Sequence, residues 1–199
     1  MATETLSGIL RNSITLSAGD TVRLTSDLQI AEGTTVTVEA GATLDLAGFE
    51  VLNFGTITLD GNDSNFAVLR NGTYSTDSTN GAFEADFGEL REFNIDSFFS
   101  DGSLRLSNTV IQNSQVEALS DNLIDNSAFI DSSFDVGIES VDVNRTTFLN
   151  SIVSIKAWNS VFGGSSTFTD VNFVNSGRAI YLDPFFSGSN NLHRLDISN

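Results

Sequence analysis

A phrase that recurs in the second half of the chain constrains its fold more than any other feature. The phrase runs apolar residue, any residue, Asn or Asp, then Ser, and its copies begin at Ile111, Phe129, Phe148 and Phe173. A final Ile197 begins the same phrase. These leading residues lie 18, 19, 25 and 24 positions apart, and a period in this range is typical of proteins built from stacked repeats.

The first half of the chain repeats in a different way. Residues 13–15, 35–37 and 56–58 read Ser/Thr-apolar-Thr and recur at 22 and 21 positions. Apolar residues alternate with polar ones, which indicates strands with one buried face, and glycines follow at intervals too short for helices. Antiparallel hairpins also fit this local spacing, but the longer period favours a coil of three strands.

The sequence therefore predicts an all-β protein, a single-stranded right-handed parallel β-helix with three strands per coil of about 22 residues. We expect residues 1–20 to cap the exposed end of the core, as solenoids require. Residues 21–199 form the β-helix in this prediction. Within it, residues 62–108 are less regular, and we expect irregular coils with longer loops there.

The recurring phrase also predicts two structural ladders. Stacked coils place like residues over like, so Ile111, Phe129, Phe148 and Phe173 should form an inward ladder. Asn and Asp adopt left-handed dihedrals readily, and stacked amides hydrogen-bond along an axis. The residues expected at that corner are Asn113, Asp131, Asn150 and Asn175.

The same phrase, with apolar and small residues following it as in Val153-Ser154-Ile155, resembles the coils of the pectate-lyase-like superfamily. The stretch 28–44 resembles the opening coils of secreted bacterial β-helix proteins of the non-catalytic type. The resemblance covers residues 20–199 and implies an architecture. It implies little about function, because that superfamily includes lyases, hydrolases, phage tailspikes, adhesins and structural proteins.

Charge and composition narrow the partners and the compartment. The net charge is −17 with nine basic residues, which disfavours nucleic acid and anionic membranes as partners. No apolar run approaches the ~20 residues of a membrane span, so we expect no membrane insertion. The first ten residues lack a basic region and a long apolar region. We therefore expect an extracellular or cell-surface protein that uses a route without a classical signal peptide.

Catalytic chemistry has weak support in the sequence, and we lean towards a non-enzyme. A lyase needs a strong base, and the one lysine, Lys156, falls at an outward strand position. A glycosidase needs two carboxyls across a sugar, for which the pairs Asp131 with Asp135 and Asp142 with Asp170 are candidates. The only histidine, His193, lies near the end of the sequence and is the only candidate base for a serine nucleophile.

Cofactor and surface sites are similarly sparse. The chain has no cysteine and one histidine, which excludes His- or Cys-based metal sites. We expect no cofactor, with Asp60, Asn62 and Asp63 as weak calcium candidates that lack the EF-hand pattern. The hydroxyl rows at 13–15, 35–37 and 56–58 resemble those of ice-binding solenoids. Two further residues, Trp158 and Tyr181, are candidates for a sugar-binding platform.

Three function hypotheses follow. The first is a non-enzymatic, secreted structural or adhesive β-helix that self-associates end to end into filaments, because open sheet edges pair with other chains. The second is a β-helix that binds or degrades polysaccharide, such as those on a cell surface. The third is a fragment of a viral spike or fibre.

Overall fold

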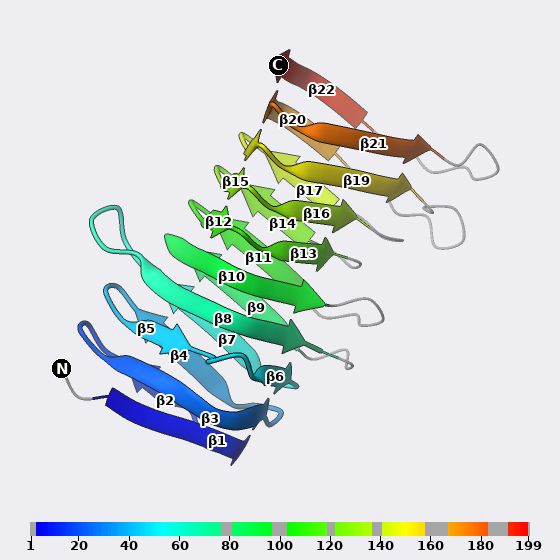
Figure 1. Ribbon diagram of the computed structural model, residues 1–199. Coiled ribbons are helices and arrows are strands. Elements are labelled where there is room, and N and C mark those ends of the chain that lie inside the picture. Colours follow the sequence, from blue (N-terminus) through cyan, green and yellow to red (C-terminus); the bar gives the residue numbers. More distant parts are fainter. Residues whose placement is uncertain are drawn as a thin grey trace.

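The chain folds as a parallel β-solenoid, which confirms the fold class predicted from the repeats. The computed structural model describes residues 3–76, 81–96, 103–118, 122–136, 141–157, 167–182 and 191–198. Each coil of about 21 residues stacks on the one before, from β1 at the N-terminal end to β22 at the C-terminal end (Figure 1). The described residues contain no helix.

Strands take up most of each coil. Their bounds are β1 (Thr3–Leu10), β2 (Ile14–Leu16), β3 (Thr21–Ile30), β4 (Thr35–Glu39), β5 (Thr43–Asp45), β6 (Glu50–Asn53), β7 (Thr56–Asp60), β8 (Ala67–Ser75), β9 (Ala82–Asp86), β10 (Gly88–Asp96), β11 (Ser103–Ser107), β12 (Val110–Gln112), β13 (Gln115–Ala118), β14 (Asn122–Asp125), β15 (Ala128–Ile130), β16 (Ser133–Val136), β17 (Val141–Asn144), β18 (Thr147–Leu149), β19 (Ile152–Ala157), β20 (Thr167–Val174), β21 (Gly177–Leu182) and β22 (Asn191–Ser198).

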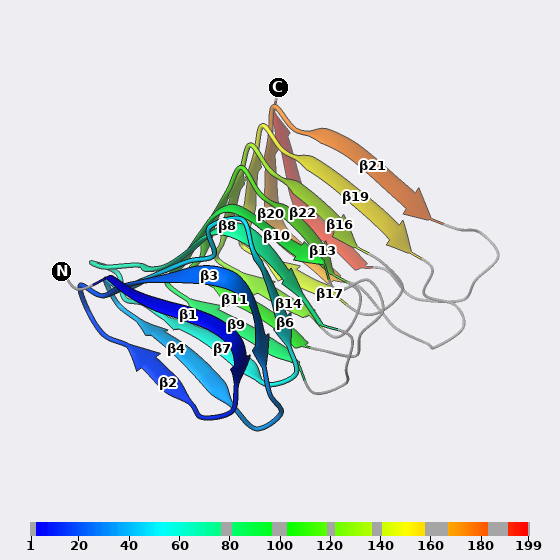
Figure 2. The same cartoon turned by 60° about the horizontal axis from the view of Figure 1, so that its bottom comes forward.

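Three faces run the length of the stack, and every pairing between these strands is parallel. Some strands continue through a corner, so that their first and second parts lie on different faces. Face A holds β5, β12, β15 and β18, with the first parts of β1, β3, β8 and β10 and the second parts of β20 and β22. Face B holds β6, β13, β16, β19 and β21, with the second parts of β1, β3, β8 and β10. Face C holds β2, β4, β7, β9, β11, β14 and β17, with the first parts of β20 and β22. Figure 2 shows β2 and β4 on a different face from β1 and β3.

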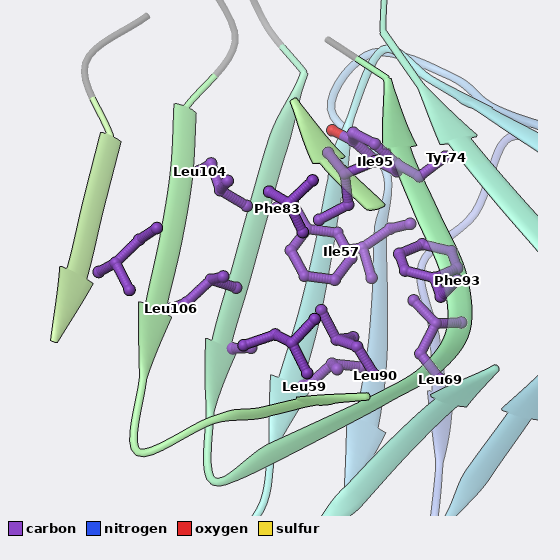
Figure 3. Close-up of a cluster of buried hydrophobic side chains, with 14 of the residues drawn as sticks. Ile57, Leu59, Leu69, Tyr74, Phe83, Leu90, Phe93, Ile95, Leu104 and Leu106 are labelled. Carbon is purple, nitrogen blue, oxygen red and sulfur yellow. The ribbon is translucent and has the colours of Figure 1, made fainter. Parts of the chain in front are cut away.

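The core lies between the three faces, because alternate side chains of each strand point inward. Inward positions carry Leu, Ile, Val and Phe, and Val36, Ile57 and Leu69 have no exposed surface. Figure 3 shows such side chains meeting from several coils, among them Ile57, Phe83 and Leu90. Each coil buries its apolar face only because the next coil covers it, so the repeat is the unit of stability.

The first twenty residues and the region 62–108 both form strands that stack in parallel with the neighbouring coils. Within residues 3–20, β1 and β2 pair in parallel with β3 and β4, so this segment forms a coil of its own. Between 62 and 108, the turn bridged by Asn62 and Asn65 precedes four strands, β8 to β11, which pair in register with their neighbours. Whether the first coil acts as a cap stays a prediction.

Candidate functional site

The apolar ladder expected from the recurring phrase occupies face A. Register places Ile111 beside Phe129, Phe129 beside Phe148 and Phe148 beside Phe173, and each is at most 2% exposed. The Phe129 and Phe148 ring centroids lie 4.8 Å apart, and those of Phe148 and Phe173 lie 5.3 Å apart with the planes 12° from parallel. Rings at these separations attract each other beyond the area they bury.

The Asn or Asp of the recurring phrase lies at the corner between faces A and B. Asn113, Asp131, Asn150 and Asn175 all have φ near +50°, in the left-handed region. The backbone N–H of Asn113 donates to Ile130 O at 3.1 Å, and that of Asp131 donates to Leu149 O at 3.0 Å, each in the next coil. The Asn150 amide also donates to Asp131 Oδ1 at 3.2 Å, along the axis. Asn and Asp tolerate this conformation better than other non-glycine residues, which explains their recurrence.

The serine of the phrase forms a ladder that the sequence reasoning missed. Ser132 Oγ donates to Ile130 O at 2.7 Å, lies 3.3 Å from Ile111 O and accepts the Ser114 N–H at 3.2 Å. Ser151 repeats this arrangement one coil later, and its Oγ accepts the Ser132 N–H at 3.3 Å. The hydroxyls therefore satisfy buried backbone groups that the sharp corner leaves out of the sheet.

A second hydroxyl ladder lies at the corner between faces C and A. Thr109, Ser127 and Thr146 are at most 4% exposed, and each hydroxyl donates to the carbonyl two residues earlier. The Thr109 N–H donates to Ser127 Oγ at 3.2 Å. The sequence carried a signal for Thr109 and Ser127, because each follows an Asn, whereas Thr146 follows Arg145, which is an unusual residue at a positive φ.

A polar groove runs along the outside of the A–B corner. It is lined by Asn94, Asn113, Ser114, Gln115, Asp131, Ser132, Ser133, Asn150 and Ile152. Amide, carboxylate and hydroxyl groups thus repeat at the spacing of the coils, about 4.8 Å. One apolar residue, Ile152, borders the groove with 64% of its surface exposed. Such a groove offers a row of hydrogen-bonding groups to a long polar ligand.

A recess opens at the N-terminal end of the stack. Its lining is Glu4, Leu6, Ile14, Thr15, Leu16, Asp20 and Val22. Ile14 is half-buried here, whereas Val36 and Ile57, the next two members of its column, have no exposed surface. This end of the core therefore presents apolar side chains to its surroundings.

Two buried polar groups sit inside the stack. Asn53, with no exposed surface, donates from its amide to Tyr74 Oη at 3.1 Å and to Ala82 O at 3.0 Å. Burial raises the pKa of Tyr74 to about 12, although the hydrogen bond from Asn53 acts in the opposite direction. These contacts join successive coils.

The carboxyl of Asp45 on face A has a lowered pKa. Burial alone raises that pKa, but the hydrogen bonds from Asn71 and the Ala47 N–H, together with the charge of Arg70, hold it below its usual value. Arg70 donates to Asp45 at 3.1 Å. This group is a structural ion pair in which both carboxylate oxygens of Asp45 accept hydrogen bonds, whereas the buried Nε of Arg70 has no partner.

The calcium candidates lie at the turn after β7. Asn62 Oδ1 accepts the backbone N–H groups of Ser64 and Asn65 at 3.0 and 2.9 Å, which closes an Asx turn. Asp63 accepts a hydrogen bond from the Ser64 hydroxyl, and Asp60 is exposed at the end of β7. Among the described residues, no three His, Cys, Asp or Glu side chains gather as a metal site would require. The calcium prediction stays untested.

The catalytic candidates are dispersed over the stack. Asp131 lies at the A–B corner and Asp135 in β16, while Asp142 lies on face C and Asp170 at a corner within β20. Lys156 pairs in register with Tyr181, and His193 pairs with Thr169. Trp158 lies outside the described residues.

The hydroxyl rows of the first half do come together. Thr15, Thr37 and Thr58 stand side by side on the outside of face C, next to the column formed by Thr35 and Thr56. Ser13, which begins the second column, uses its hydroxyl to accept the Thr35 N–H at 3.0 Å. The array spans three coils, and the next coil continues it with Ala82 and Glu84.

The chain matches no protein-family model, and comparison with curated proteins and with solved structures returns no significant similarity. In the part of the chain that the structure describes, no helix is long and apolar enough to cross a membrane.

Proposed function

We propose that the protein is a non-enzymatic, extracellular structural or adhesive β-solenoid. The observation that carries this proposal is the pair of hydroxyl ladders. At the C–A and A–B corners of the coils from β10 onward, a buried hydroxyl links one coil to the next through backbone groups, as Ser151 links to the Ser132 N–H and the Phe129 carbonyl. A stack joined this way through these coils, with Phe129, Phe148 and Phe173 ring over ring, forms a stiff rod.

The length of the described stack follows from its register. The column on face A that begins at Thr5 continues through Arg23, Asp45, Arg70, Arg91, Gln112, Ile130, Leu149 and Val174 to Ser198 without a break in register. At a strand spacing of about 4.8 Å this column extends roughly 43 Å. A surface charge of −17 keeps such a rod soluble outside the cell. Self-association of its ends supplies longer filaments.

We also propose that the coils belong to the pectate-lyase-like superfamily, and two features support this assignment. The corner residues with positive φ and the stacked Phe and Asn positions are those of the phrase that suggested the family. This assignment concerns descent and architecture. It adds no catalytic role.

Imaging and a turnover assay test the proposed function together. Electron microscopy of the purified chain should show straight, rigid particles, and incubation with neutral and uronate polysaccharides should release no product. Product release that follows protein concentration overturns the non-enzymatic role. Particles that bend or collapse overturn the structural role.

A second candidate is binding of a neutral polysaccharide, and the polar groove at the A–B corner favours it. The amide side chains that line the groove suit sugar hydroxyls, whereas the carboxylate of Asp131 disfavours acidic polymers. Ser133→Arg places a long side chain in the groove, and Thr147→Arg places the same side chain outside its lining, on face A. Retention on a glycan array that is lost in S133R and kept in T147R supports this candidate. No retention by the wild type removes it.

A further inference from the structure

The acidic charge of the protein is concentrated on two of its three faces. Among the residues that pair between β3 and β20 and whose side chains the structure describes, face C carries six outward acids, from Glu39 in β4 to Asp142 in β17, and one arginine, Arg105. On face B the outward charged residues of this set are all acids, namely Glu50, Asp96, Glu117 and Asp135. Two copies that approach each other through face B or face C therefore meet like charge.

Face A has a different charge balance. Its outward charged residues over the same stretch are three arginines and two acids, namely Arg23, Arg70, Arg91, Asp45 and Glu89. Arg70 donates to Asp45 at 3.1 Å, and Arg91 Nε donates to Glu89 Oε1 at 2.6 Å. Face A is thus nearly neutral in a chain whose net charge is −17, and two copies repel each other least when they approach along it.

The second half of face A is apolar on its outer side. Figure 1 shows β12 and β15 in succession along this part of the stack, and β18 and β20 continue it in register. The outward side chains of these four strands on face A are uncharged and half-buried, and five of them are apolar, namely Val110, Ala128, Ile130, Leu149 and Val174. A sheet face in contact with water is ordinarily polar, so this composition indicates a surface that another layer covers.

The outward residues of face A form two columns that complement each other. Glu89 and Ala128 belong to the first column, and Arg91 and Ile130 belong to the second. A two-fold axis that runs parallel to the stack over the centre of face A places the first column of one copy opposite the second column of the other, at the same height. Glu89 then lies opposite the partner's Arg91, and Ala128 lies opposite the partner's Ile130. Between β3 and β20, this arrangement sets no like charges of face A opposite each other.

From these observations we propose that two copies of this chain pair side by side through face A, about a two-fold axis parallel to the stack. Sheets that pack face to face in this way lie about 10 Å apart, which covers the apolar columns of both copies. The contact uses the same face of each copy, so the assembly closes at a dimer. This pairing goes beyond the proposed structural role and does not depend on it.

The size of face A sets the strength of the dimer. From β3 to β20 the face contains eight strands in register, which extend about 34 Å along the stack and about 10 Å across it. A footprint of roughly 340 Å² is smaller than the ~800 Å² that each partner buries in a stable complex. We therefore expect a weak dimer, with a dissociation constant between about 10 μM and 1 mM.

Sedimentation equilibrium at several protein concentrations tests the pairing. The mass of the wild type should rise from that of one copy, 21.3 kDa, towards two copies and no further. Leu149→Asp places a charge within the apolar half of face A and should raise the dissociation constant about tenfold or more. Leu123→Asp is the matched control, because Leu123 is also a half-buried outward leucine but lies in β14 on face C. It should leave the dissociation constant unchanged, and circular dichroism checks that both variants are folded.

Charge reversal tests the direction of the two-fold axis. Glu89→Arg creates two like-charged pairs across the dimer and should raise the dissociation constant about fivefold. The double variant Glu89→Arg/Arg91→Glu restores opposite charges at both places and should recover the wild-type value. Added salt should strengthen the dimer, because it screens the repulsion between two chains with a net charge of −17 each.

Three outcomes overturn the pairing. The first is a wild type that stays at one copy up to about 1 mM; if Leu149→Asp then loses retention on a glycan array, face A binds a sugar polymer instead. The second is a rise in mass that is identical in Leu149→Asp and Leu123→Asp, because it comes from another surface. The third is equal weakening by Glu89→Arg and by the double variant, which means that the two columns do not face each other.

Discussion

Replacing Ser132 with Ala tests whether the buried hydroxyl ladder holds the coils together. Ser132 is 6% exposed, and its Oγ accepts the N–H of Ser114, itself 6% exposed, at 3.2 Å. The same hydroxyl donates to Ile130 O at 2.7 Å. The substitution removes these bonds, and it adds no side chain that reaches either group.

The expected cost follows from the donor that is left without a partner. A buried N–H without an acceptor costs about 1–3 kcal/mol, and the change from Ser to Ala removes little volume. We therefore expect the free energy of unfolding to fall by about 2 kcal/mol. With a urea dependence of about 2 kcal/mol per molar, the midpoint moves down by about 1 M.

The assay is urea unfolding followed by far-ultraviolet circular dichroism and by fluorescence, whose coincidence checks two-state behaviour. The matched control is Ser133→Ala, a neighbouring residue with a half-buried side chain that lines the outer groove. It should change stability by less than about 0.5 kcal/mol.

Hydrogen exchange gives a readout at a single atom. The amide of Ser114 should exchange faster in S132A, while the amide of Phe129, further along the coil, should be unchanged. If S132A and S133A have equal free energies of unfolding and the Ser114 amide exchanges at an unchanged rate, the hydroxyls do not stabilise the contact between coils and the argument is refuted.

Three further predictions concern the core, its pH dependence and its turns. Phe148 has no exposed surface and stacks on Phe129 and Phe173, so Phe148→Ala should lower the free energy of unfolding by about 3–5 kcal/mol, as measured by urea unfolding, and Phe148→Leu by distinctly less. Burial raises the pKa of Tyr74 in the folded chain to about 12, above its usual value of 10.0. Above pH 10 the unfolded chain therefore loses this proton while the folded chain keeps it, and stability should fall with rising pH up to about 12, by roughly 2–3 kcal/mol in total. Tyr74→Phe should remove that part of the decline, and an unchanged pH profile in this variant contradicts the assignment. A Cβ on Gly55 would meet the carbonyl oxygens of Thr34 at 2.2 Å and Ala31 at 2.7 Å, so Gly55→Ala should depress the thermal midpoint much more than Gly33→Ala, where the added Cβ meets nothing within 4 Å and only the positive φ is strained.

The serine ladder shows where prediction from the sequence stops. The phrase that contains Ser114, Ser132 and Ser151 was recognised, but Ser is an ordinary turn residue and its local context does not indicate burial. Its acceptor and donor groups belong to coils 18 to 22 residues away. Burial of a polar side chain depends on those distant partners, and they are identified only once the register between coils is known.

The open recess and the outer groove are also products of tertiary structure. Leu6 and Ile14 read as ordinary strand residues, and only the position of their coil at the end of the stack leaves them half-buried. The groove arises because the left-handed corner brings corner residues such as Asn113 and face B residues such as Gln115 to one hollow.

The sequence by itself determined the architecture of this protein, because the one-coil period of Phe129, Phe148 and Phe173 makes like residues stack, and stacking buries them. It also determined the corner between faces A and B, since the Asn and Asp residues of the phrase enter the left-handed region at low cost. The tertiary structure decided which polar groups are structural and which are free to bind. That outcome depends on contacts between coils, and their geometry follows from the register of whole strands and not from any short segment.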